Sequence, residues 1–230
     1  MGGTNIMESL SPAAHDCDAP LLHASVYEEL RARMITGKFV PGIGISTRAL
    51  ALELGVSQMP VRDALSRLAA EGAVQIRSKR RIEIPQMTGS RFTDLLDCRL
   101  LLEPEAAVQA MPHITAERVR DLAAYDQALE TAIENGDVLG YMENNYAFHF
   151  GMYRSGSRPT LVRLIETLWL QFGPYMRLVH ERVGAATIVD QHHLALAAIA
   201  KQDGEALRAA VAADIRDGMD MIGKSRWPRI

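Results

Sequence analysis

Four cationic side chains fall within five residues of one another, at Arg77, Lys79, Arg80 and Arg81. The residues on either side, 73–76 and 82–84, alternate between apolar and polar types, which is typical of two short strands joined as a hairpin. Like charges repel, so an ordinary solvated loop gives no reason for their concentration, whereas a phosphate backbone does. The sequence therefore predicts a hairpin whose tip binds phosphate.

A helix-turn-helix pattern lies directly before this hairpin, over residues 46–72. Ala51 is small enough for two helices to approach closely, and Gly55 can take the positive φ that ends the first helix. Val61 supplies an apolar plug beneath the second helix. Many helix pairs in proteins that bind no DNA share this pattern, so the pattern alone leaves DNA binding open.

The second helix of the pair is expected to open at Ser57, whose hydroxyl can accept a hydrogen bond from a free amide of the first turn. Val61, Leu65 and Leu68 recur at helical spacing and are expected to face the core. The other faces carry three further side chains near the helix start: Gln58, Met59 and Arg62. These side chains are positioned to enter a major groove.

The charge of the chain is distributed unevenly. The 230 residues have a formal net charge of -3, yet residues 22–88 hold 10 Lys and Arg against 6 Asp and Glu, so this part carries +4 and the remainder -7. A basic N-terminal third on an acidic body favours a separate DNA-contacting module. Two cysteines, no signal-peptide pattern and no apolar run of membrane-spanning length predict a cytoplasmic protein with no membrane partner.

Three parts are expected along the chain: a loose tail over 1–20, a winged helix-turn-helix domain over 21–86, and an all-helical domain over 87–230. The fold class is mainly α. Prolines, glycines and polar pairs divide the last part into about six helices, roughly 88–111, 115–135, 137–155, 158–182, 186–202 and 203–223. Pro104 and Pro174 fall inside two of these helices and are expected to kink them.

The chain resembles a GntR-family transcriptional regulator of the FadR-like branch over residues 22–222. The resemblance is carried by GKFVPGIGIS, LALELGVSQMPVRDALSRLAAEGAV, RLLLEPEAAVQA, the Phe148-His149 pair and HHLALAAIAKQDGEALRAAVAADI. It implies a winged helix-turn-helix and an all-helical effector-binding domain of the FCD type, which has a metal site in many members. It also implies a homodimer that binds operator DNA, with a small carboxylic acid weakening or strengthening that binding.

By this resemblance, operator contacts are expected from Arg48, Ser57, Gln58, Met59, Arg62, Lys79, Arg80 and Arg81. Gln58 stands where the family usually has an Arg, and Gln prefers adenine edges over guanine in a bidentate contact. Arg81 stands where the wing usually has a Gly. We therefore expect a shifted operator preference, with Arg62 still anchoring phosphate or guanine.

The resemblance also implies a metal site at Asn145, His149, His192 and Asp214. The family pattern is one Asp and three His, whereas here Asn145 takes the Asp position and Asp214 the final His position. Both arrangements keep one carboxylate with neutral partners, so a divalent ion would retain a positive charge that can hold an anionic effector. Zinc, nickel, manganese and iron all suit such ligands. Loss of the metal, with the histidines serving only as pocket residues, is the alternative.

Arg99 is the expected effector ligand, because its two-pronged guanidinium can clamp a carboxylate. The alternative is an ion pair with Glu103 at i+4, worth about 0.2–0.5 kcal/mol on an exposed helix.

The sequence thus predicts a DNA-binding regulator that responds to a small carboxylic acid, with no enzymatic activity. Two histidines and a carboxylate also describe a catalytic iron site, but no nucleophile, phosphate loop or acid–base pair of carboxylates accompanies them. A third alternative is a DNA-binding dimer whose helical domain is purely structural.

Overall fold

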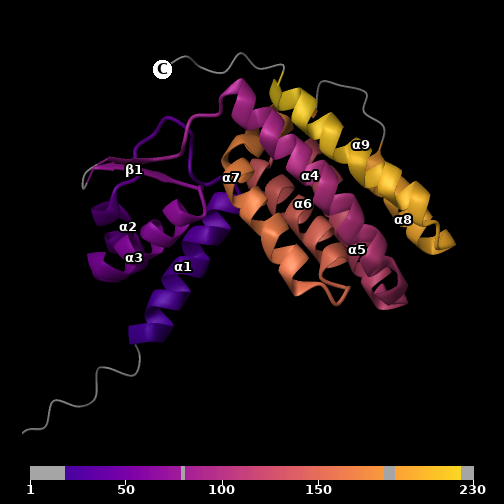
Figure 1. Ribbon diagram of the computed structural model, residues 1–230, viewed down its shortest axis with the longest axis horizontal. Helices are drawn as coiled ribbons and strands as arrows, with labels where there is room; N and C mark the ends of the chain where they lie inside the picture. The colour runs from indigo at the N-terminus through magenta and orange to yellow at the C-terminus, as the bar shows by residue number, and fades with distance from the viewer. Residues whose placement is uncertain (1–18, 79–80, 184–189, 224–230) are drawn as a thin grey trace, which may run out of the picture.

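The computed structural model describes residues 19–78, 81–183 and 190–223. A small N-terminal part of three helices and a hairpin lies on one side, and a larger helical bundle lies on the other (Figure 1). Helix α1 (Ala19–Ile35) contacts helices of both parts. The mainly α fold class predicted from the sequence is confirmed.

The N-terminal part is a winged helix-turn-helix, as predicted. After α1 it comprises α2 (Thr47–Leu54), α3 (Gln58–Ala70), β1 (Gln75–Ser78) and β2 (Arg81–Glu83). The two strands pair antiparallel with Ile76 opposite Ile82, and an isolated bridge from Ile45 to Ile82 extends the sheet. The wing is therefore attached to the chain that leads into α2.

The turn between α2 and α3 follows the expected chemistry. Gly55 adopts φ 66° and ends α2 in the left-handed region that favours glycine. Val61, Leu65 and Leu68 are fully buried, so the apolar stripe of α3 faces the core as predicted. This packing leaves the start of α3 projecting outward.

Two details of the sequence prediction were wrong. The Ser57 hydroxyl makes no capping hydrogen bond, because the amide that a capping side chain usually reaches, three residues on, belongs to Pro60 and has no N–H. The first strand begins two residues later than expected, since Ala73 and Val74 are buried and the Ala73 amide donates to Leu68 O at 2.9 Å to end α3.

The bundle contains the six expected helices among the residues described. They are α4 (Gly89–Ala110), α5 (Ala116–Glu134), α6 (Val138–Tyr153), α7 (Pro159–Val183), α8 (Gln191–Lys201) and α9 (Gly204–Gly223), with a short 3-10 turn η1 (Met111–His113) after α4. Pro104 lies within α4 and Pro174 within α7. The fifth helix begins at Gln191 rather than at residue 186, because Asp190 caps it by accepting from the His193 amide at 2.9 Å. Positions 186–189 of the expected range are outside the described residues.

Helix α7 packs tightly against the C-terminal end of α1. A Cβ added to Gly173 would lie 2.6 Å from Met34 O and 2.8 Å from Ile35 O, so only glycine permits this approach. An ion pair from Arg31 of α1 to Glu166 of α7, at 2.8 Å, also links the two helices. Helix α7 runs beside α1 at the junction of the two parts (Figure 1).

The same helix also holds the linker between the two parts. Gln171 Oε1 accepts from Arg91 Nη2 at 2.9 Å, and this nitrogen also donates to Gly72 O at the end of the helix-turn-helix. Tyr175 donates from its hydroxyl to Pro85 O at 2.6 Å. Helix α7 therefore contacts α1, the end of α3 and the linker together. No helix in the described part of the chain is long and apolar enough to cross a membrane.

The Gly173 contact predicts opposite effects for the same substitution at two helical glycines. Gly173→Ala forces α1 and α7 apart and is expected to lower the free energy of unfolding by about 1–3 kcal/mol. Gly218→Ala, where a Cβ meets nothing within 4 Å, is expected to raise it by about 0.5–1 kcal/mol because alanine favours helix. Urea denaturation of both variants measures the two changes, and a stabilised Gly173→Ala protein would contradict the packing.

Candidate functional site

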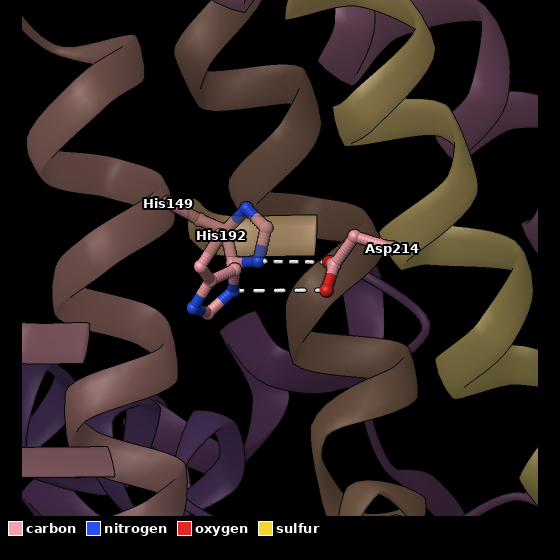
Figure 2. Close-up of side chains that lie close together, drawn as sticks. All are labelled: His149, His192 and Asp214. Atoms are coloured by element: carbon pink, nitrogen blue, oxygen red, sulfur yellow. Dashed lines mark ion pairs between the residues drawn. The ribbon is translucent and has the colours of Figure 1, made fainter. Parts of the chain in front are cut away.

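Three side chains from three helices converge inside the bundle. His149 comes from α6, His192 from α8 and Asp214 from α9, and Figure 2 shows both rings directed at the carboxylate. His149 Nε2 lies 3.1 Å from Asp214 Oδ2, and His192 Nε2 lies 3.6 Å from Asp214 Oδ1. One ligand atom from each residue lies within 4.8 Å of the others. The structure therefore brings together three of the four residues expected at a metal site.

The tautomer of His149 follows from its neighbours. Tyr153 donates its hydroxyl hydrogen to Glu103 Oε2 at 3.0 Å, because an ionised carboxylate only accepts. The Tyr153 oxygen lies 3.1 Å from His149 Nδ1 and must accept from it. In the neutral ring, the proton of His149 is thus on Nδ1, and Nε2 presents a lone pair to Asp214.

His192 is held in the same tautomer by a different carboxylate. Its Nδ1 lies 2.8 Å from Asp126 Oδ1, so Nδ1 carries the hydrogen and Nε2 is bare in the neutral ring. The ring stacks on Phe148 with centroids 3.9 Å apart and planes 13° from parallel. His192 Nε2 is buried and has no hydrogen-bond partner among the described residues.

Two lone pairs and a carboxylate facing one another require a cation between them. A proton on His149 Nε2 would form a hydrogen bond to Asp214, which lies within reach, and would satisfy this one contact. A metal would serve all three, and a tetrahedral ion with bonds of about 2.1 Å separates its ligands by about 3.4 Å. The observed separations of 3.1 and 3.6 Å lie on either side of this value. The donor set therefore fits a divalent ion.

The site's electrostatics favour the ionised carboxylate. Burial alone would raise the pKa of Asp214, but the hydrogen bond and charge of His149, with His192 and Arg99, lower this pKa to about 2. Burial likewise disfavours the imidazolium of His192, yet its hydrogen bond to Asp126 and the nearby acidic charges raise the pKa of His192. Asp214 is therefore negative near neutral pH.

A cavity of about 210 Å³ opens next to this cluster. Asn145, the fourth expected metal ligand, is buried and lines the same cavity, one helical turn before His149. Apolar side chains complete much of its wall: Leu129, Ile133, Met176 and Ile215. This space is small, about that of seven liquid waters.

Arg99 also lines the cavity, and it forms the ion pair that was the alternative to an effector contact. Glu103 Oε1 accepts from Arg99 Nε at 2.5 Å, and Oε2 accepts from Nη2 at 3.3 Å. The value given for an exposed helical pair does not apply to this environment, because both side chains are at least 96 % buried. Arg99 Nη1 takes no part in either bond, so the pair with Glu103 leaves the N–H donors of this nitrogen unused.

Glu103 is the acceptor around which this part of the core is built. Besides Arg99 and Tyr153, it accepts from Trp169 Nε1 at 3.1 Å. The guanidinium of Arg99 also lies over the rings of Trp169 and Phe172, with 5.0 and 4.9 Å to the centroids. A single buried carboxylate thus connects α4, α6 and α7.

A second hollow marks the outer surface of the winged helix-turn-helix. Arg48 of α2, Gln58 and Arg62 of α3, and Ile82 of β2 line it, so two predicted contact cations and Gln58 share one groove. Arg62 Nη2 donates to Gln58 Oε1 at 3.4 Å. Met59 is 62 % exposed at the start of α3. Ser57 immediately precedes that start and is also exposed.

In the described part of the wing, one carboxylate lies beside two of the predicted cations. Arg77 of β1 and Arg81 of β2 both pair with Glu83 of β2, with Arg81 Nε at 3.0 Å from Glu83 Oε2. Lys79 and Arg80 are outside the described residues. Their expected contacts with DNA stay predictions.

Sequence reasoning did not assign a role to Asp126 or Tyr153. It also missed Glu103 as a hub, the shared acceptor for Arg99, Tyr153 and Trp169. A usable signal existed for Asp126, because it shares the apolar face of α5 with Leu122 and Leu129, and that position favours burial. Tyr153 lies one turn after His149, within reach on the same helix. Buried polar residues of this kind need partners, which only the tertiary structure identifies.

A winged helix-turn-helix joined to a helical bundle with a polar cavity defines a ligand-responsive, DNA-binding regulator of transcription. Two family models match the chain: "Bacterial regulatory proteins, gntR family" over residues 22–84 and "FCD domain" over residues 94–217. The chain belongs to the GntR family and carries an FCD domain.

Named relatives agree with this assignment. The chain is 28 % identical over 194 residues to the HTH-type transcriptional regulator McbR of Escherichia coli K12, covering 83 % of this chain and 88 % of that protein. It is 24 % identical over 204 residues to the gluconate operon transcriptional repressor of Bacillus subtilis, covering 84 % and 82 %. These relatives are named as regulators rather than enzymes, as the sequence predicted.

Solved structures show the same architecture. The structure of E. coli McbR/YncC aligns with a TM-score of 0.81 and 27 % identity over 88 % of this chain and 97 % of that one. A putative GntR regulator from Rhodococcus sp. RHA1 aligns with a TM-score of 0.71 at 20 % identity, over 88 % and 98 %, and supports the fold alone.

The Glu103 hub predicts a large stability cost for a small change. Glu103→Gln leaves Arg99 buried without its counter-charge and is expected to cost about 3–5 kcal/mol of unfolding free energy. The matched control is Glu105→Gln on the same helix, whose half-exposed pair with Arg208 should cost at most about 1 kcal/mol. Equal urea midpoints for the two variants would contradict the hub.

Proposed function

We propose that the chain binds a specific operator in the cytoplasm as a homodimer, and that a small carboxylate in the cavity changes its operator affinity. The observation that carries this proposal is the convergence of two bare imidazole nitrogens and one carboxylate beside Arg99. Such a cluster calls for a cation, and a bound cation attracts a carboxylate. The B. subtilis relative is named for the operon of a sugar acid, gluconate, which supports this ligand class.

His149, His192 and Asp214 would hold a divalent ion, zinc, nickel, manganese or iron, with Asn145 as a weaker fourth ligand. The ion would supply positive charge at the inner end of the cavity. Tyr153 and Asp126 hold the two imidazoles so that both Nε2 lone pairs face inward. Arg99 adds the donors of Nη1 for the effector's carboxylate.

Helix α7 offers a mechanical route from the cavity to the DNA-binding part. Met176 of α7 lines the cavity. Trp169 of the same helix donates a hydrogen bond to Glu103. Gly173 and Glu166 contact α1, which in turn packs on α3. A ligand that favours one position of α7 therefore favours one orientation of the recognition helix. Coupling of this kind changes affinity by about 5- to 150-fold.

The homodimer is part of the proposal because one recognition helix reads only a half-site. Helix-turn-helix proteins commonly present two such helices one DNA turn apart.

Fluorescence anisotropy on DNA from upstream of the chain's own gene tests this function. A panel of small carboxylic acids and a chelator are added in turn, with salt titrated to count phosphate contacts. We expect at least one acid to change operator affinity by about 5- to 150-fold, and chelation to remove that response.

A matched pair of variants sharpens this test. His149→Ala with His192→Ala removes both imidazoles from the cavity and should abolish the response while the protein still binds DNA. His193→Ala, exposed on α8 beside His192 and outside the cavity, should keep it. If the double variant responded like the parent protein, the effector would not bind at the histidine cluster; a parent protein that responds to no acid would instead favour a structural dimerisation module.

Operator preference is expected to depend on Gln58. Gln58→Arg should move the preferred base at one position of each half-site from adenine toward guanine, worth about 1–3 kcal/mol of discrimination. Arg62→Ala should weaken binding, whereas Arg216→Ala, an exposed cation on α9, should not. Binding-site selection from randomised DNA measures the preference, and an unchanged base profile for Gln58→Arg would show that Gln58 reads no base.

A further inference from the structure

The charges around the cavity do not match a ligand that carries only negative charge. Among the described lining residues, one arginine, Arg99, faces five carboxylates: Asp126, Glu130, Asp190, Asp214 and Asp217. With both histidines neutral, this lining carries four net negative charges, and a divalent ion leaves two. A simple carboxylate entering this space meets excess charge of its own sign.

Exposure separates these charges into an inner and an outer group. Arg99, His149 and His192 are all at least 93 % buried and form the floor of the cavity. Glu130 and Asp190 are exposed, and Asp217 is half-buried. These three carboxylates, Glu130, Asp190 and Asp217, are called the acidic mouth below.

The floor shows an independent sign of a ligand. His192 Nε2 is buried, faces the cavity and lacks a hydrogen-bond partner in the described structure. Arg99 keeps Nη1 outside its pair with Glu103. A metal ion that binds His192 Nε2 and carries the ligand's carboxylate, with Arg99 Nη1 donating to that carboxylate, would satisfy both groups, which assigns the negative end of the ligand to the floor.

The mouth carboxylates each have one oxygen engaged by the protein and a second oxygen outside that bond. Asp190 Oδ1 accepts from the His193 amide at 2.9 Å, and Asp217 Oδ2 accepts from Gln191 Nε2 at 3.1 Å. Glu130 Oε2 accepts from Gln127 at 3.1 Å. These bonds fix the carboxylates in place while Asp190 Oδ2, Asp217 Oδ1 and Glu130 Oε1 take no part in them.

The distance between floor and mouth is set by helix geometry. Asp217 follows Asp214 by three residues on α9, and Glu130 follows Asp126 by four on α5, so these two mouth residues lie about one helical turn, roughly 5 Å, from the carboxylates that contact the floor histidines. The apolar side chains of Leu129 and Ile215 line the same cavity. A short aliphatic chain suits this lining.

We infer that the effector is a small zwitterion, with its carboxylate at the Arg99 and histidine floor and an ammonium group at the acidic mouth. This inference rests on the proposed function and narrows its ligand class to short amino-carboxylic acids. The mouth then selects against dicarboxylates and against uncharged tails of equal size, because only a cation compensates its carboxylates.

Isothermal titration of the full-length, metal-replete protein at low salt tests this class with matched probes. The probes are 5-aminopentanoate, hexanoate, which has a methyl group in place of the ammonium, and glutarate. We expect 5-aminopentanoate to bind at least tenfold more tightly than hexanoate and glutarate to bind most weakly. Asp190→Asn with Asp217→Asn should erase the preference, since Asn still caps α8 and keeps the size of both side chains.

Asp220→Asn is the control, because Asp220 is exposed on α9 outside the cavity and its loss should leave the preference intact. Hexanoate binding as tightly as 5-aminopentanoate, or a preference that survives in the double variant, would overturn the zwitterion and leave the proposed function standing. If none of the three acids bound the parent protein and no acid of the operator panel acted, the proposed function would fall with it.

Discussion

Two imidazole lone pairs and one carboxylate meet inside the bundle, and this electrostatic conflict organises the rest of the domain. Asp126 and Tyr153 fix the ring protons of His192 and His149 on Nδ1, which turns both bare nitrogens toward Asp214. A cation shared among the three would relieve the conflict and link α6, α8 and α9.

Helix α7 connects this site to the DNA-binding part because it has contacts on both sides. Met176 borders the cavity, while Gly173 allows α7 to approach α1 more closely than any other residue would permit. Packed cores have discrete arrangements rather than continuous ones, so a small change at the cavity can select an orientation of α1 and α3. The coupling that we propose would thus be a property of packing and would need no mobile linker.

Much of the fold could be predicted from the sequence, because it depends on local signals. Gly55, the buried stripe of Val61, Leu65 and Leu68, and the punctuation between helices all act within a few residues. The start of β1 was missed because the Ala73 amide instead bonds to Leu68 O and ends α3, a local competition between the helix end and the strand. The Ser57 cap failed for a local reason, the missing N–H of Pro60, which the sequence already contained.

The site was predictable only in part. Resemblance identified His149, His192 and Asp214, whereas Asp126, which orients His192, and Glu130 at the mouth lie on α5, a helix that only the tertiary structure places beside them. Anomalous X-ray diffraction at the zinc, nickel, iron and manganese edges tests the shared cation most directly. We expect one anomalous peak about 2.0–2.2 Å from Nε2 of both histidines and beside the Asp214 carboxylate. An ordered water there instead, with no anomalous signal from metal-supplemented protein, would contradict the account.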